Sequence, residues 1–106
     1  MDTPLDQSFD DALKALANPV RRKILAALKE PEVNFPGQQH SYELGICARM
    51  IEAACGLSQS TVSAHLAQLH LAGLLMARKF GQFTFYTRDE AAIAAFLARL
   101  DQDLHP

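Results

Sequence analysis

The sequence predicts a small, mainly α-helical domain with one β-hairpin (an α+β fold), in the order of four helices, two strands and a closing helix. Apolar residues recur at helical spacing along most of the chain. Two β-compatible runs flank Gly81. A length of 106 residues provides one modest core. We therefore expect a single domain spanning 1–106.

Two helices are predicted before the first loop. Pro4–Ala17 carries apolar residues at every third or fourth position, which indicates a first helix. Pro19 suits the first turn of a second helix, and that helix should end at Pro31. From Pro31 to His40 the proline, glycine and amide residues indicate a loop.

Two further helices, joined by a short turn, are predicted next. Ser41 and Ser58 are residues that cap helix N-termini, and Gly56 and Gly73 are residues that end helices. The resulting helices are separated by a turn of three residues containing a glycine, which is typical of a helix-turn-helix. The predicted buried stripe of the second one is Val62, Leu66 and Leu69.

The last third of the chain predicts a hairpin and a final helix. Leu74–Lys79 and Gln82–Arg88 are β-compatible runs separated by a tight turn at Gly81. Asp89 is a good N-cap for a helix from Glu90 to about Asp103. Helices, a two-stranded wing and a closing helix in this order describe a winged helix-turn-helix.

Charge is unevenly distributed along this chain of net charge −2. No acidic residue lies between Ala53 and Arg88, an interval of 36 residues. The basic residues and histidines in it are Arg78, Lys79, Arg88, His65 and His70. Such a local excess of positive charge is expected where phosphates approach, and chance placement is the alternative.

Composition and motifs exclude several classes of protein. Two cysteines cannot form a scaffold of several disulfides, and the first residues lack the pattern of a signal peptide. We therefore expect a cytoplasmic location with reduced thiols. The longest uncharged run contains polar residues throughout, so we expect no membrane association. No catalytic or metal-binding motif is present, so we expect no enzyme activity, no cofactor and no metal.

The exposed face of the helix that follows Ser58 is the candidate DNA-reading surface. Ser60 and Ala64 point away from the buried stripe, and these short side chains allow close entry into a major groove. Gln59 lies in the first turn, where backbone N–H groups favour a phosphate. An ordinary solvated surface is the alternative for both helix and wing. The candidate contacts to double-stranded DNA are Gln59, Ser60, Thr61, Ser63, Ala64, Gln68, Arg78, Lys79 and Gln82.

Three parts of the chain resemble the ArsR/SmtB family of bacterial repressors. They are Ala15–Leu25, Gly56–Leu66 together with Leu71–Leu75, and the wing Arg78–Tyr86. The resemblance implies a homodimer that binds an operator, an imperfect inverted repeat, and that an effector releases. In this family the first and last helices form the dimer interface. The corresponding apolar residues are Leu5, Phe9, Leu13, Phe96, Leu97 and Leu100.

The family's usual metal ligands are missing. Its arsenite-sensing type carries Cys-Val-Cys after Glu-Leu, whereas Gly45-Ile46-Cys47 stands here. Cys47 and Cys55 on one helix would lie about 12 Å apart, too far to bind one ion together.

Three interpretations of Cys47 and Cys55 as possible sensors stay open. In the first, both are small buried side chains. In the second, they are thiols that react with an oxidant or an electrophile. In the third, Cys47 binds arsenite or a soft metal together with ligands from other parts of the chain or from the partner subunit. The segment from Glu30 to Ser41 is longer than the family's usual connection and is a candidate pocket wall for a small organic effector. The alternative to a DNA-binding regulator is a winged-helix module that binds other proteins.

Overall fold

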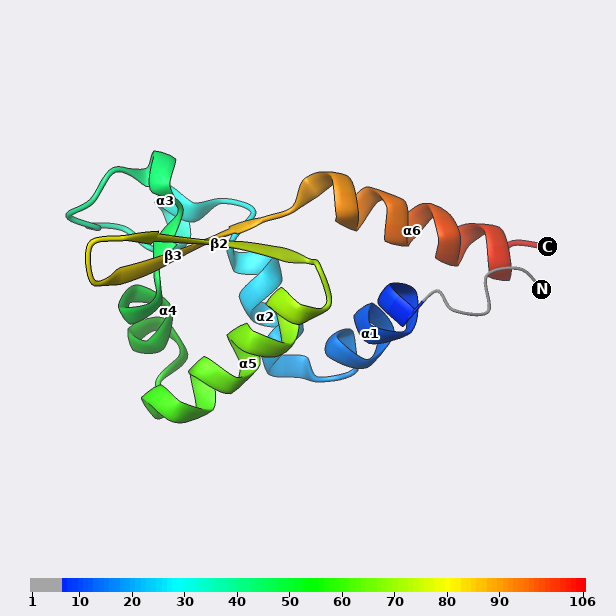
Figure 1. Cartoon of the computed structure of the whole chain (residues 1–106), viewed down its shortest axis with the longest axis horizontal. Helices are drawn as coiled ribbons and strands as arrows, with labels where there is room; N and C mark the ends of the chain where they lie inside the picture. Colours follow the sequence, from blue (N-terminus) through cyan, green and yellow to red (C-terminus); the bar gives the residue numbers. More distant parts are fainter. Residues whose placement is uncertain (1–6) are drawn as a thin grey trace.

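The computed structural model describes residues 7–106, so Leu5 and the start of the predicted first helix lie outside the described residues. The predicted mainly helical fold with a hairpin is confirmed (Figure 1). Its elements are α1 (Gln7–Leu16), α2 (Pro19–Ala27), α3 (Pro31–Asn34), the 3₁₀ helix η1 (Tyr42–Leu44), β1 (Ile46–Cys47), α4 (Ala48–Cys55), α5 (Gln59–Leu71), β2 (Leu75–Phe80), β3 (Phe83–Arg88) and α6 (Glu90–Leu104).

The predicted helix from Ser41 to Gly56 is wrong over its first half. Ser41 caps only the 3₁₀ turn η1, where its Oγ accepts a hydrogen bond from the backbone N–H of Glu43 at 3.1 Å. Strand β1 follows, pairs with β3 and extends the hairpin to a three-stranded antiparallel sheet in the order β1-β3-β2. The helix begins only at Ala48. The predicted loop before it opens with the short helix α3.

Gly45 is required where the chain enters β1. Its φ of +103° is one that L-residues rarely adopt. A Cβ at this position would lie 2.7 Å from the carbonyl oxygen of Tyr86 and 2.8 Å from Cγ2 of Thr87. The Gln38 side chain then holds β1 from its outer side, because its Oε1 accepts from the N–H of Cys47 at 2.8 Å and its Nε2 donates to the Gly45 carbonyl at 3.0 Å. The outer edge of the sheet is thereby covered.

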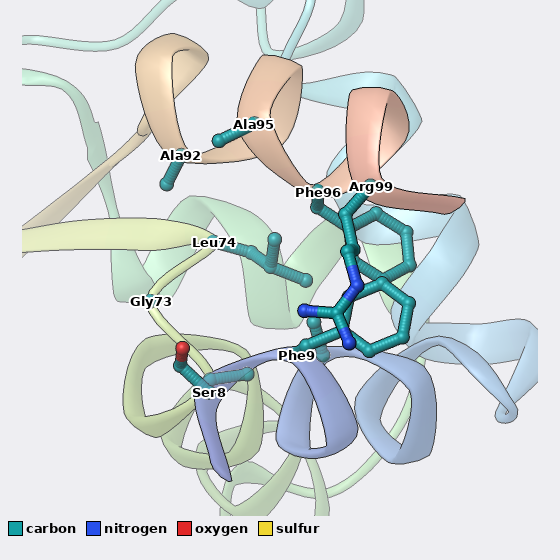
Figure 2. Close-up of a pocket in the computed structure, with 10 residues that line it drawn as sticks. Ser8, Phe9, Gly73, Leu74, Ala92, Ala95, Phe96 and Arg99 are labelled. Carbon is teal, nitrogen blue, oxygen red and sulfur yellow. The ribbon is translucent and has the colours of Figure 1, made fainter. Parts of the chain in front are cut away.

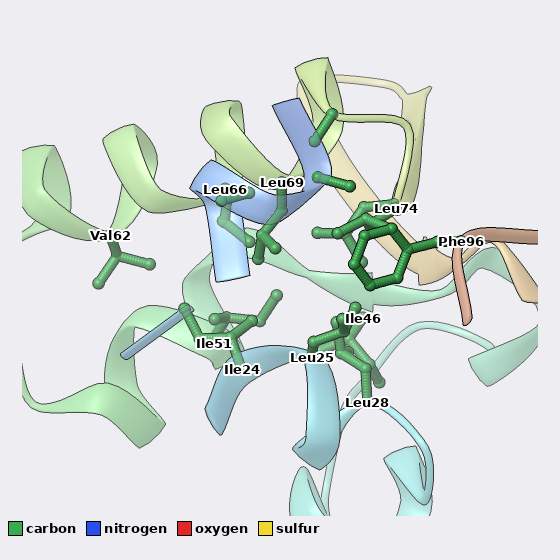
Figure 3. Packing of buried hydrophobic residues seen from close by; sticks show 14 of the residues in the cluster. Ile24, Leu25, Leu28, Ile46, Ile51, Val62, Leu66, Leu69, Leu74 and Phe96 are labelled. Atoms are coloured by element: carbon green, nitrogen blue, oxygen red, sulfur yellow. The ribbon is translucent and has the colours of Figure 1, made fainter. Parts of the chain in front are cut away.

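The hydrophobic core is built around one side of α5 (Figure 3). Val62, Leu66 and Leu69 are fully buried there, as predicted. They lie against Ile24 of α2 and Ile51 of α4. Helix α5 therefore cannot rotate about its axis without leaving a cavity in the core.

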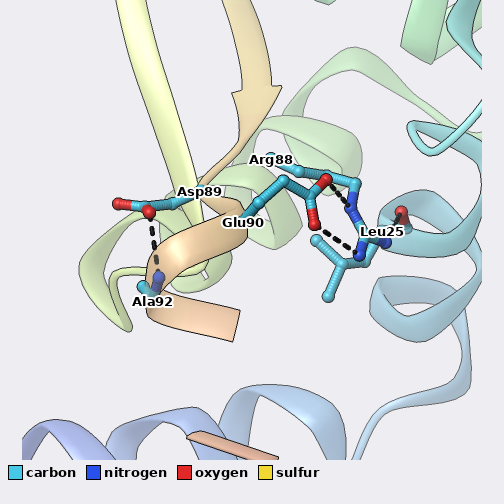
Figure 4. A network of polar contacts seen from close by, with 5 residues as sticks. All are labelled: Leu25, Arg88, Asp89, Glu90 and Ala92. Atoms are coloured by element: carbon cyan, nitrogen blue, oxygen red, sulfur yellow. Dashed lines mark hydrogen bonds and ion pairs between the residues drawn. The ribbon is translucent and has the colours of Figure 1, made fainter. Parts of the chain in front are cut away.

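A polar network fixes the direction in which α6 leaves the sheet (Figure 4). Arg88 donates to the Leu25 carbonyl of α2 at 3.0 Å and forms two hydrogen bonds with the Glu90 carboxylate, at 2.8 and 3.2 Å. These bonds hold the pKa of Glu90 below its usual value. The Asp89 side chain caps α6 by accepting from the N–H of Ala92 at 3.0 Å. Arg88 thus joins α2, β3 and α6 at one point.

The substitution Gly45→Ala should lower the free energy of unfolding by about 3 kcal/mol. Alanine is unfavourable at this positive φ, and its Cβ would also clash with the Tyr86 carbonyl oxygen. Gly37→Ala is the matched control: Gly37 also has a positive φ, but nothing lies within 4 Å of its Cβ position, so about 1 kcal/mol is expected. Urea denaturation followed by circular dichroism measures both. Equal losses would contradict the close approach at Gly45.

Candidate nucleic-acid interface

Helices α4 and α5 form the predicted helix-turn-helix, and the three-residue turn between them is confirmed. Gly56 ends α4 in the left-handed conformation, with φ of +66°. Ser58 then caps α5, because its Oγ accepts from the N–H of Thr61 at 3.3 Å and donates to the Thr61 Oγ1 at 2.8 Å. The Thr61 hydroxyl is therefore already engaged in the cap, and its neighbours on α5 are better placed to reach outward.

The candidate contact residues are all exposed, and those on α5 lie outside its buried stripe. The exposed ones on α5 are Gln59, Ser60, Thr61, Ser63, Ala64 and Gln68, and those on the wing are Arg78, Lys79 and Gln82. The predicted inner and outer faces of α5 are thus confirmed. Contact of these side chains with DNA stays a prediction.

The two basic residues of the wing point to opposite faces of the hairpin. Arg78 lies opposite Phe85 in the β2–β3 ladder, so these two side chains share a face. Lys79 shares the other face with Leu75, which is buried in the core. Gln82 lies in the turn between the strands. The wing therefore presents one positive charge on each face and an amide at its tip.

Arg49 adds a positive charge beside the wing, and no sequence pattern points to it. It is exposed in the first turn of α4, with its guanidinium carbon 5.6 Å from the centre of the Phe83 ring. The His40 ring lies on the same Phe83 ring, with centres 5.1 Å apart. Arg49 and Phe83 are far apart in the sequence, so only the folded chain reveals this cation next to β3.

Two other arginines stabilise the framework. Arg21 and Arg22 donate to backbone carbonyls in the last turn of α1, at 2.8 and 2.6 Å. Cations are favourable at a helix C-terminus. A guanidinium nitrogen of Arg21 also lies 3.3 Å from Nδ1 of His65, which is half-buried on α5. This contact favours a packing role for His65.

Helices α1 and α6 enclose an apolar cleft of about 240 Å³ (Figure 2). The rings of Phe9 and Phe96 lie 5.3 Å apart within it, and the Arg99 guanidinium lies 4.6 Å from the centre of the Phe9 ring. Phe96 is only 8% exposed and belongs to the core of its own chain, whereas Leu13 and Leu97 are 40% and 56% exposed. Among the predicted interface residues that the structure describes, which exclude Leu5, these two leucines are the most exposed.

The two cysteines are free thiols at opposite ends of α4. Cys47 is buried and lies on β1, not on a helix as predicted. Cys55 is half-buried, and burial raises the pKa of its thiol. Residues 7–106 contain no group of three or more His, Cys, Asp or Glu side chains that could hold a metal ion. No helix of this described part is long and apolar enough to span a membrane.

Comparison with known proteins points to one family. The model of the bacterial regulatory proteins of the arsR family matches residues 47–76, from β1 to the start of β2. The HTH-type transcriptional regulator YbzH of Bacillus subtilis is 39% identical over 85 residues, which cover 78% of this chain and 85% of YbzH.

Solved structures share the whole fold. HlyU from Vibrio cholerae is 27% identical, with a TM-score of 0.64 and all of both chains covered. The homodimeric winged helix-turn-helix DNA-binding domain Mb0332 from Mycobacterium bovis is 29% identical, with a TM-score of 0.63 over 93% of this chain and 82% of that one.

In the native protein, Cys55 should react with iodoacetamide before Cys47, because Cys47 is buried within the sheet while Cys55 is partly accessible. Mass spectrometry of adducts over time measures both rates, and Cys55→Ser should remove the faster one. Faster modification of Cys47 would contradict its burial.

Proposed function

Given that this chain belongs to the ArsR family of bacterial regulatory proteins, we propose that it represses transcription as a homodimer bound to an imperfect inverted repeat in double-stranded DNA. The observation that carries this proposal is the outer face of α5. That face consists of short and amide side chains, and the opposite side is locked in the core. A regulator of bacterial genes acts on the chromosome, so we expect it in the cytoplasm.

The outer face of α5 suits a major groove in both shape and chemistry. Ser60, Ser63 and Ala64 are short, so the helix backbone can approach the base edges closely. Gln59 and Gln68 carry amides that can pair with the adenine edge. The N-terminus of α5 points free N–H groups outward, which favours a phosphate of the backbone.

The positive side chains around the wing support the same proposal. Lys79 on β2 and Arg49 on α4 are both exposed, and within residues 7–106 neither forms an ion pair with a carboxylate. Such cations can bind the phosphates of the DNA backbone. These contacts raise the affinity of the protein for DNA without reading the base sequence. We therefore assign positioning to the wing and base reading to α5.

The shape of the domain supports a homodimer. Helix α6 extends away from the body, with α1 lying alongside it (Figure 1). The radius of gyration is 14.6 Å, against about 13 Å for a compact domain of this length. Leu13 and Leu97 are exposed on these two helices. A two-fold partner that covers them would place two α5 helices on successive turns of DNA.

Release by an effector is part of the proposal. Cys47 precedes α4 and Cys55 is its last residue, eight positions later, which corresponds to about 12 Å along the helix axis. An oxidant or electrophile would therefore react with each thiol separately, because the spacing suits neither an intramolecular disulfide nor a shared arsenite.

Ser60→Glu and Ala64→Glu should each reduce affinity for the upstream promoter DNA more than about a hundredfold, since a carboxylate would face phosphates and base edges at close range. Gel retardation at low salt measures the affinity. The melting temperature should hardly change, because both positions are exposed.

Ala26→Glu is the matched control, an exposed alanine on α2 outside the proposed interface. It carries the same added charge and should retain most of the affinity. Full binding by the α5 variants would contradict the proposed DNA-reading face. Absence of low-salt binding by the unmodified protein to any upstream fragment would favour a protein-interaction module instead.

Leu97→Glu should convert the dimer to monomers in sedimentation equilibrium, because it places a charge in the proposed apolar interface. Phe96→Glu is unsuitable for this purpose, since Phe96 belongs to the core of its own chain. Gln102→Glu, also exposed on α6, is the control and should leave the dimer intact. A Leu97→Glu protein that stays dimeric would place the interface elsewhere.

A further inference from the structure

A second apolar cavity, of about 390 Å³, lies between α2, α4 and Phe35, the residue that follows α3. Its deep wall is formed by Ile24, Phe35 and Ile51, each at most 3% exposed. Phe35 is held in place by its carbonyl, which accepts from the Tyr42 hydroxyl at 2.5 Å. The volume is within the range of pockets that bind small molecules, roughly 300–1,000 Å³.

The charge at this cavity has one sign. Among the described residues that line it, Lys23 is the only charged one, and no carboxylate lines it. Lys23 is exposed on α2, so its ammonium can lie at the mouth while the deep wall stays apolar. Cys55 lines the same cavity, and burial raises the pKa of its thiol, as apolar surroundings do.

We propose that this cavity binds a small organic acid with an apolar body, such as a medium-chain carboxylate. The hydrocarbon part lies against Ile24, Phe35 and Ile51, and the carboxylate meets the Lys23 ammonium at the mouth. An uncharged molecule of the same length gains only the apolar part, and a cationic one is repelled by Lys23.

The position of the cavity links its occupant to the helix-turn-helix. Ala54 and Cys55 belong to the end of α4, and Leu57 belongs to the turn before α5. A bound acid therefore touches the segment that sets the direction of α5, and we expect it to change operator affinity. This regulatory link rests on the proposed function, whereas binding of the acid does not.

Binding is tested on the full-length protein without DNA, with octanoate, 1-octanol and octylammonium as probes. Octanoate should bind saturably in titration calorimetry and should slow the alkylation of Cys55 by iodoacetamide, because the acid covers that thiol. The alkylation of Cys47 should not change, since Cys47 lies outside the cavity. Octanol should bind more weakly, and octylammonium weakest.

Lys23→Gln should weaken octanoate binding about fourfold, which is the change expected when one partly exposed ion pair is lost. The affinity for octanol should not change. Lys29→Gln is the matched control, an exposed lysine just after α2 that does not line the cavity. Ala54→Phe should abolish binding of octanoate and octanol by filling the cavity, with a melting curve to verify folding. Lys23 is exposed, so Lys23→Gln should fold normally. The comparison of Lys23→Gln with Lys29→Gln therefore still tests the site if Ala54→Phe does not fold.

Absence of saturable octanoate binding, or equal effects of Lys23→Gln and Lys29→Gln, would overturn the proposed site. Octanoate binding without any change in operator affinity would overturn the regulatory link alone. Failure of the ligand-free protein to bind any operator would instead overturn the proposed function, and the octanoate result would stand independently.

Discussion

The burial of one side of α5 is the constraint on which the rest of the structure depends. Val62, Leu66 and Leu69 are enclosed by α1, α2 and α4, so the position and rotation of α5 are set by the core. A helix of this length would be marginal in isolation, which means that tertiary packing holds it. On the opposite face, Ser60 and Ala64 are exposed and do not belong to the core. The proposed DNA-reading surface and the core contacts thus lie on opposite sides of one helix.

Five of the ten basic residues show two different kinds of surroundings. Arg21, Arg22 and Arg88 bind backbone carbonyls at helix ends, and Arg88 also binds a carboxylate. Arg49 and Lys79 point outward around the wing. The interval 53–88, which holds α5 and the hairpin, contains no acidic residue, so the net charge of −2 does not describe the charge along this part of the chain.

Elements fixed by local chemistry could be predicted from the sequence, and those fixed by distant contacts could not. The caps Ser58 and Asp89 bond within their own helices, so both starting points were predictable. The segment before Cys47 has helical spacing, yet contacts from Gln38 and the β3 backbone make it a strand. At the candidate site, periodicity predicted the outer face of α5. It could not reveal Arg49, which reaches the wing only in the folded chain.

The most direct test of the DNA-binding surface is amide NMR of the isotope-labelled protein, titrated with a duplex from its own promoter region. The largest shift changes should fall in residues 58–68 and 78–83, with small additional changes near Arg49. Residues of α3 and of the outer end of α6 should hardly respond. Changes confined to α3 or α6, with α5 unaffected, would contradict the proposal that the outer face of α5 binds DNA.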